Sequence, residues 1–268
     1  MKQWWLAVGA LFLILSTFEV EAAVANQVNI SLQDVIETVE KTVTIDKSTG
    51  QPFLTTVTAD FFQRSTLAEQ KRELKAEGEM SVKWGGTASP LMFRFDYFRP
   101  TTQEILSNGQ TLWMYLPENR QVIVSDVSFV FNPSGFNAER DRAVNFLQGL
   151  GRISKDFLIT FSPQRQDISG NYILELSPRR ASVMMGKLFI VVARDAVTRY
   201  VGNGRRLVFD PVSPELAFPI LSSTVIDPKG NMTTMEFTNI KANIWLSDGL
   251  FNFIMPAGVE VVRPPTGH

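Results

Sequence analysis

Residue types that carry nucleophilic or metal-assisted chemistry are nearly absent from this chain. Its 268 residues include no cysteine and a single histidine, His268, at the end of the sequence. Chain ends are usually poorly ordered, so His268 is a weak candidate for a base or a ligand. A Ser-His-Asp site, a Cys-His site and a zinc site therefore cannot be assembled from these residues.

Carboxylates are the remaining candidates, because a pair of them could act as general acid and base. Those in question lie beside turns or on surface strands, where a solvated charge is the ordinary interpretation: Asp126, Asp141, Asp156, Glu175 and Asp210. The glycines of Gly202-Asn203-Gly204-Arg205 lack the spacing of a phosphate-binding loop. We therefore expect no enzyme, no metal and no cofactor, with a carboxylate-pair enzyme as the alternative.

Residues 1–25 have the pattern of a signal peptide. A basic Lys2 precedes an apolar run from Leu6 to Leu15, and Ala23-Val24-Ala25 provides a small-x-small cleavage site. The run is short for a stable membrane anchor, which is the alternative. Removing this segment balances the acidic and basic residues, which argues against a nucleic-acid partner. We expect export, with residues 26–268 forming one domain.

Alternating patterns predict β-strands along most of the chain. Between residues 73 and 84 apolar or small side chains alternate with charged or polar ones, which is typical of an antiparallel sheet covered on one side. Leu91, Phe93, Phe95 and Tyr97 share one face, and Asn108-Gly109 predicts a hairpin. We expect about eleven strands, the later ones including Lys187–Arg194, Phe218–Ile226, Met232–Ile240 and Leu250–Met255.

Two amphipathic helices accompany the predicted strands. Ser31 and Asp34 resemble a capping box before apolar residues at helical spacing, and a second helix is expected from Ala138 to Leu150. Each could simply stabilise the sheet, or it could be a movable cover. The predicted fold class is mainly β with a helical lid (α+β), an incomplete antiparallel barrel with helices on its hollow side.

Apolar surface is abundant, with 20 phenylalanines and 9 methionines. Pockets for apolar ligands are lined mainly by aliphatic and aromatic side chains, and methionine lets a lining adapt. Any one of these aromatic residues taken alone is more simply explained as core. One apolar concave face, two amphipathic covers and no catalytic set together predict a carrier for apolar ligands.

Several motifs, in order along most of the chain, resemble the LolA family, the periplasmic carriers that move lipoproteins to the outer membrane. They are Phe61-Phe62-Gln63, Leu106-Ser-Asn-Gly-Gln-Thr-Leu-Trp-Met-Tyr-Leu-Pro117, Phe146-Leu-Gln-Gly, Ser154-Lys-Asp-Phe157, Leu250-Phe-Asn-Phe and Pro256-Ala-Gly-Val259. The resemblance implies a cavity for acyl chains under a helical lid, and a monomer in the periplasm. It also implies two partners: an ATP-driven lipoprotein-releasing complex of the inner membrane and an outer-membrane receptor.

The residues expected to matter follow from these strands and helices. The acyl-chain-binding set is Phe61, Met80, Val82, Phe93, Phe95, Leu106, Trp113, Met114, Phe146, Leu147 and Leu150, and the lid set is Leu32, Val35, Ile36 and Val39. In the LolA family a basic residue followed directly by proline commonly ends the second strand, where an arginine helps to hold the lid shut. Here Lys83 is followed by Trp84 instead of proline, so Arg94 is the nearest substitute for this lid latch. The segment Tyr200–Ala217 resembles an insertion of unknown role. A carrier of another lipid and a sensor of mislocalised lipoproteins stay open as alternatives.

Overall fold

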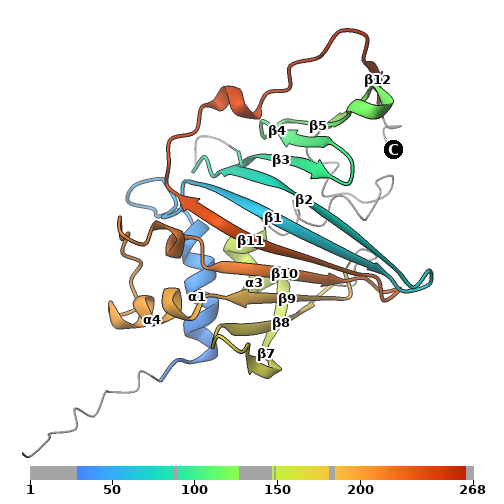
Figure 1. The fold of residues 1–268 in the computed structure, drawn as a ribbon. Helices are drawn as coiled ribbons and strands as arrows, with labels where there is room; N and C mark the ends of the chain where they lie inside the picture. Colours follow the sequence, from blue (N-terminus) through green and yellow to red (C-terminus); the bar gives the residue numbers. More distant parts are fainter. Residues whose placement is uncertain (1–28, 87–89, 127–146, 148, 181–184, 264–268) are drawn as a thin grey trace, which may run out of the picture.

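The structure, a computed structural model, describes residues 29–86, 90–126, 147, 149–180 and 185–263. Within these residues twelve strands form one open sheet in the order β12-β6-β5-β4-β3-β2-β1-β11-β10-β9-β8-β7 (Figure 1). The strands are β1 (Thr56–Leu67), β2 (Arg72–Lys83), β3 (Met92–Arg99), β4 (Gln103–Ser107), β5 (Thr111–Leu116), β6 (Gln121–Asp126), β7 (Phe157–Gln166), β8 (Tyr172–Pro178), β9 (Lys187–Val192), β10 (Ile220–Ile226), β11 (Met232–Ala242) and β12 (Glu260–Val262). The predicted fold class is confirmed, although the pairing of β12 with β6 is parallel.

Among the described residues the helical elements are fewer than the strands, and all but the two longest are single short turns. They are α1 (Leu32–Val43), η1 (Pro117–Asn119), η3 (Leu150–Arg152), α3 (Ile153–Asp156), α4 (Arg194–Gly202), η4 (Pro214–Ala217) and η5 (Asp248–Phe251). Figure 1 shows α1 passing behind the sheet, with α3 beside it and α4 near one end. None of the described helices is long and apolar enough to cross a membrane.

The hairpin of β1 and β2 explains how the sheet acquires two unlike faces. Val57 pairs with Val82 and Ala59 with Met80, and all four side chains are buried. The residues between them, such as Thr58 and Ser81, point the other way and are half-buried. Because side chains alternate along a strand, this register puts Val57, Ala59, Met80 and Val82 on one face. We call it the inner face, since α1 packs there.

Local turn and cap chemistry agrees with the sequence. Gly109, in the Asn108-Gly109 turn between β4 and β5, has a φ of 89°, which glycine adopts without strain. At the start of α1 the Ser31 hydroxyl accepts the amide of Asp34, and the Asp34 carboxylate accepts the amide of Ser31. The predicted capping box is therefore confirmed, and it gives α1 a rigid first turn.

Two predicted segments differ in the structure. The prediction of a strand at Leu250–Met255 is wrong. Its first two residues belong to the short helix η5, which begins after Ser247, and the next strand, β12, spans Glu260–Val262. The segment Tyr200–Ala217, predicted as an insertion of unknown role, does lie between β9 and β10, but it begins inside α4, a helix that was not predicted and whose N-cap, Ala193, makes no side-chain capping bond. The predicted helix Ala138–Leu150 lies mostly outside the described residues.

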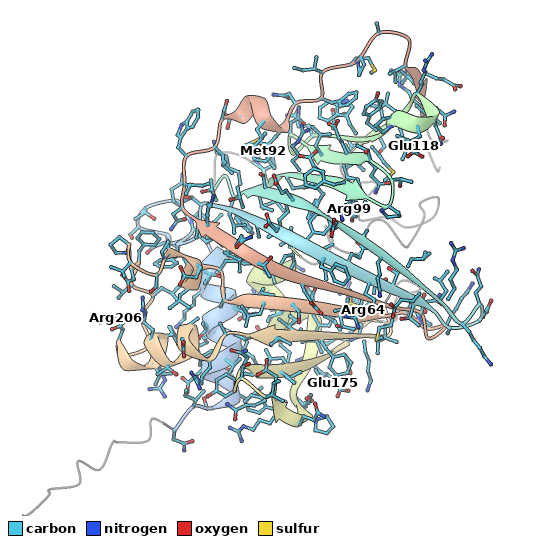
Figure 2. The ribbon with its side chains drawn as sticks, in the orientation of Figure 1. Arg64, Met92, Arg99, Glu118, Glu175 and Arg206 are labelled. Carbon is cyan, nitrogen blue, oxygen red and sulfur yellow. The ribbon has the colours of Figure 1, made fainter. Side chains whose placement is uncertain are left out.

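The outer face of β3–β6 is covered by the C-terminal segment. η5 lies beside β3, where the Arg94 guanidinium donates to the carbonyl of Leu250 at 3.4 Å. Lys83 at the end of β2 binds Asp248 with 2.6 Å between Nζ and Oδ1. Beneath this cover Leu106 and Phe251 are fully buried, and Met92, labelled in Figure 2, is nearly so.

Candidate functional site

The inner face of the sheet holds most of the residues predicted to bind an apolar ligand. Six of them lie on inner-face positions of four strands within the run β1–β5: Phe61, Met80, Val82, Phe93, Phe95 and Met114. Each is at most 2% exposed, and all belong to one apolar cluster with Leu147 and Leu150. The aromatic rings interlock, with 5.8 Å between the ring centroids of Phe61 and Phe95.

Two members of the predicted set point the other way. Leu106 pairs across the sheet with Arg94 and with Trp113, so all three side chains share the outer face. Leu106 is buried there, and Trp113 is partly buried. We correct their assignment: they lie on the side of the sheet covered by the C-terminal segment. Phe146, the last member of the set, lies outside the described residues.

Helix α1 lies with its apolar stripe against the inner face. Val35, Ile36 and Val39 are at most 6% exposed and belong to the same cluster as the strand residues, and Leu32 packs at its margin. These four are the residues predicted for the lid. At its C-terminal end the helix is joined to the structure by the Thr42 carbonyl, which accepts the amide of Leu54 at 2.7 Å. The closed face is thus filled by the protein's own side chains where α1 covers it.

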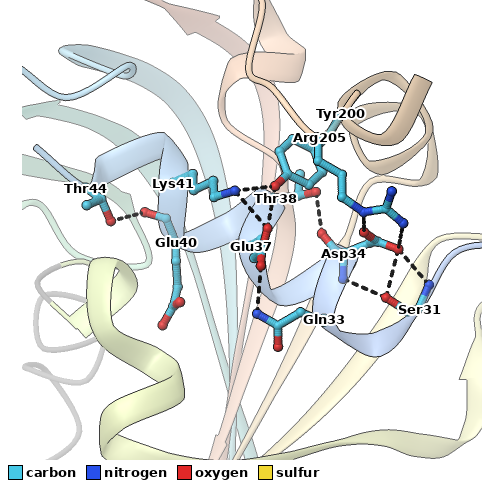
Figure 3. Close-up of polar contacts among 10 residues, drawn as sticks. All are labelled: Ser31, Gln33, Asp34, Glu37, Thr38, Glu40, Lys41, Thr44, Tyr200 and Arg205. Atoms are coloured by element: carbon cyan, nitrogen blue, oxygen red, sulfur yellow. Dashed lines mark hydrogen bonds and ion pairs between the residues drawn. The ribbon is translucent and has the colours of Figure 1, made fainter. Parts of the chain in front are cut away.

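The N-terminal half of α1 is held by a residue from far along the chain (Figure 3). Arg205 donates from Nε to Oδ1 of Asp34 at 2.7 Å and from Nη2 to Oδ2 at 3.3 Å. The Asp34 side chain is 2% exposed, whereas that of Arg205 is 55% exposed. Burial alone raises the pKa of Asp34, but the hydrogen bonds from Arg205 and Ser31 outweigh it and lower that pKa. Asp34 is therefore a charged carboxylate that needs these donors.

A second polar contact lies one turn further along α1. The Tyr200 hydroxyl donates to Oε2 of Glu37 at 2.5 Å, and Lys41 Nζ donates to Tyr200 Oη at 2.6 Å and to Glu37 Oε2 at 2.8 Å. Hydrogen bonds from Lys41, Tyr200 and Gln33 lower the pKa of Glu37 to about 2. Tyr200 is itself 1% exposed, and this burial raises its pKa. The network joins α1 to the last turn of α4.

Arg94, the residue predicted to latch the lid, does not contact α1. It lies on the outer face, with 2.7 Å from Nε to Oδ2 of Asp96 and 2.8 Å from Nη2 to Oε2 of Glu104. Its remaining donor reaches the C-terminal segment. The prediction for Arg94 is wrong because the alternation of β3 directs Phe93 and Phe95 inward and therefore Arg94 outward.

Beyond the reach of α1, the described residues leave part of the inner face uncovered. A hollow of about 250 Å³ lies where β1–β4 approach their far ends, and its lining includes Gln63, Ala76, Leu74 and Tyr97. Gly78 borders this region from β2: a Cβ there would lie 2.8 Å from the ring of Phe61 and 2.0 Å from the carbonyl oxygen of Asp96. The missing side chain lets the Phe61 ring lie flat over β2 at the end of the apolar face.

Sequence reasoning missed Tyr200 and Arg205. No local signal identifies them, because Arg205 contacts a residue 171 positions earlier and sits in a turn that the strand pattern did not predict. Within the described residues, no group of three or more His, Asp or Glu side chains is arranged to hold a metal ion.

The family to which this chain belongs is shown by its match to a family profile. The profile of the family described as "Outer membrane lipoprotein carrier protein LolA" matches residues 53–199, which is more than half of the sequence. The chain belongs to the LolA family. The matched region runs from just before β1 into α4, so it contains the inner-face strands and Tyr200 lies just beyond it.

Curated relatives agree with this LolA assignment. An outer-membrane lipoprotein carrier protein from Methylobacillus flagellatus is 23% identical over 204 residues, covering 76% of this chain and 80% of the relative. One from Azotobacter vinelandii is 26% identical over 210 residues, covering 78% and 82%. Among solved structures, a LolA superfamily protein from Nitrosomonas europaea is 17% identical with a TM-score of 0.40, covering 84% of this chain and 98% of the other.

Proposed function

We propose that this LolA-family protein carries lipoproteins by receiving their acyl chains against the inner face of its sheet. Family membership supports a lipoprotein-carrier role in general. The observation that carries the specific proposal is the continuous apolar cluster formed by inner-face strands and the stripe of α1. The acyl-chain-binding residues are Phe61, Met80, Val82, Phe93, Phe95 and Met114, with Leu147 and Leu150 beside them, and residues 26–268 act as one carrier domain.

Entry of a ligand requires that α1 move away from the face. Val35 and Val39 are fully buried in the same apolar cluster as Phe95 and Met114, so an acyl chain that enters this cluster takes the place of the α1 stripe. The free energies of the empty and the loaded protein are nearly balanced, because the inner face buries apolar surface in both. In the empty protein it is covered by the α1 stripe, and in the loaded protein by the acyl chain. This near balance matters because burying one CH₂ contributes about 0.8 kcal/mol, and three long chains against water would exceed any measured affinity.

The relevant comparison is between the protein and a bilayer, which are both apolar, so loading and unloading need only a small difference in free energy. This suits a carrier located between two membranes. We infer a periplasmic protein that receives its cargo from an ATP-driven releasing complex in the inner membrane and delivers it to an outer-membrane receptor. Neither step requires catalysis by the carrier itself.

The first experiment tests the ligand. The purified protein is incubated with a synthetic diacylated lipopeptide, a phospholipid or a glycolipid, and binding is followed by native mass spectrometry. We expect one lipopeptide per chain and weaker binding of the other two. Preferential binding of the glycolipid or phospholipid would overturn the lipoprotein assignment. In cells, depletion of the protein should leave lipoproteins in the inner-membrane fraction; normal sorting with altered envelope signalling would instead identify a sensor.

The second experiment tests the movement of α1. The amide of Ser154 donates to the Glu40 carboxylate at 2.7 Å, so cysteines introduced by Glu40→Cys and Ser154→Cys stand close enough for a short bismaleimide. The natural sequence has no cysteine, so the reagent joins only these two positions. We expect the crosslinked protein to lose lipopeptide uptake, while each single variant capped with a monomaleimide keeps it. Unchanged uptake after complete crosslinking would contradict the proposed opening.

A further inference from the structure

The segment Tyr200–Ala217 lies beside α1 and is held by its own hydrogen bonds and an ion pair; we call it the arm. Arg205 has a left-handed backbone with a φ of 62°, and its amide donates to the Tyr200 carbonyl at 2.9 Å. Further along, Arg199 of α4 binds Asp210 across the loop at 2.5 Å, and Asp210 accepts the amide of Val212 at 2.8 Å. These bonds fix the position of the Arg205 guanidinium relative to α4, so the arm can hold whatever the guanidinium binds.

What it binds is α1, at two points one helical turn apart. Asp34 accepts a hydrogen bond from Arg205, and Glu37 accepts one from Tyr200. Within the described residues, Tyr200 and Arg205 provide the side-chain hydrogen bonds that reach Asp34, Glu37 and Lys41 from other elements, and the only other such bond with the span Leu32–Lys41 is that from the Ser154 amide to Glu40, near the C-terminal end of the helix. The stripe of α1 that faces the sheet is apolar. Its contact with the strands buries apolar surface, but this interaction is non-directional and does little to fix the orientation of the helix.

We propose that Arg205 and Tyr200 are positioning residues that hold α1 closed over the inner face, and that the release of their contacts admits the acyl chain. The inference rests on the proposed carrier function and assigns a role to the Tyr200–Ala217 segment. It replaces Arg94 as the latch with a pair of residues from outside the strands that form the apolar face.

The chemistry of the two contacts suits a reversible latch. The Arg205 side chain is half exposed, and an ion pair open to water on one side contributes modestly, so it shifts an equilibrium rather than locking it. Asp34 is buried while closed, but it keeps its two bonds with Ser31 when Arg205 leaves. The first turn of α1 therefore stays capped, and the helix can move as one body instead of unravelling.

The test uses a matched pair of neighbouring arginines. Arg205→Gln removes the charge that binds Asp34. Arg206→Gln makes the same change one residue later, at a side chain labelled in Figure 2. Arg206 is exposed and forms no hydrogen bond or ion pair with any described residue. Tyr200→Phe removes the hydroxyl bound to Glu37 while keeping the buried ring, and Arg205→Lys restores a positive charge. Asp34 itself is left intact, because changing it would also remove the helix cap.

Two readouts are measured on the full-length processed protein: amide hydrogen exchange resolved by peptide, and the rate of association with the diacylated lipopeptide. We expect Arg205→Gln and Tyr200→Phe to speed the exchange of the α1 amides about fivefold, the effect of losing roughly one hydrogen bond. The amides of β1 and β11 should exchange as in the wild type. Lipopeptide association should accelerate in the same variants, with Arg206→Gln unchanged and Arg205→Lys in between.

Each contrary result has a definite meaning. Equal exchange of α1 in Arg205→Gln and Arg206→Gln would overturn the latch, and so would faster exchange throughout the sheet, which indicates a general loss of stability. Faster exchange of α1 with an unchanged rate of association would overturn its gating role. Failure of the wild type itself to bind the lipopeptide would refute the proposed function, while the exchange difference would still support the closed-state contacts.

Discussion

The ring of Phe253 lies against the ring of Tyr115, with 5.3 Å between the centroids and 51° between the planes. Tyr115 is an outer-face residue of β5, next to the inward-facing Met114. The contact therefore belongs to the C-terminal cover, on the side of the sheet opposite α1. The outer face of β3–β5 carries apolar residues such as Leu106 and Tyr115 beside the charged group of Arg94, Asp96 and Glu104, and its cover is separate from α1.

The outer cover should contribute to global stability. Phe251 is fully buried, so Phe251→Ala should lower the free energy of unfolding by about 3 kcal/mol, the loss typical of a buried phenylalanine. Urea denaturation followed by tryptophan fluorescence measures this. Ile254, three residues later and 86% exposed, provides the control: Ile254→Ala should change stability by less than about 0.5 kcal/mol. Similar small effects for both variants would show that the C-terminal segment is not a structural cover.

Gly78 should tolerate no side chain. A Cβ at this position would meet the Asp96 carbonyl oxygen and the Phe61 ring, and the backbone oxygen cannot move without breaking the register of β2 and β3. We expect Gly78→Ala to lower the free energy of unfolding by about 2 kcal/mol or more. Combining it with Phe61→Leu, which removes the ring but not the carbonyl, should recover only part of the loss. Full recovery would mean that the ring alone demands glycine.

Acid should weaken the hold on α1. Folding lowers the pKa of Glu37 from its ordinary 4.5 to about 2, so the stabilisation is present above pH 4.5 and is lost as the pH falls from 4.5 toward 2. The lowered pKa of Asp34 acts in the same direction. Because Glu37 is partly solvated, we expect a contribution of about 1–2 kcal/mol. Urea unfolding should find Glu37→Gln less stable than the wild type at pH 7 and equal to it near pH 2. A difference that persists at low pH would contradict this.

Adjacent residues of β5 should differ in their access to the ligand. Met114 faces inward and Trp113 outward, so a lipopeptide with a photoreactive group near the end of its acyl chain should label Met114 and Phe95 but not Trp113 or Leu106. Fragmentation of the labelled peptides by mass spectrometry distinguishes the two neighbours. Labelling of Trp113 at the level of Met114 would place the acyl chain on the other face and refute the assignment.

Much of the sheet could be predicted because its signals are local. The strict alternation of residues 73–84 and the Asn108-Gly109 turn each depend on neighbours in sequence, as does the capping box of Ser31 and Asp34. All three are present in the structure. Helix α1 also lies on the apolar face of the sheet, as predicted for a cover.

Alternation failed where both faces are apolar. β4 has Ile105 beside Leu106, and β5 has Trp113 between two apolar residues, so a period of two cannot distinguish inward from outward. The distinction depends on the C-terminal segment, more than 100 residues later in the sequence, whose apolar residues were predicted as a strand. The latch depends likewise on a distant segment, because nothing around Arg205 indicates that it will meet Asp34.

That separation of 171 residues also sets an order for folding. Helix α1 stands near the beginning of the described chain, yet the strands β8–β11 that share its cluster and the arm that holds it come after residue 170. During synthesis the apolar stripe of α1 therefore stays incompletely covered until most of the chain has been made. Docking of this helix should be a late step in maturation, and the period before it is when the newly made protein most needs protection from aggregation.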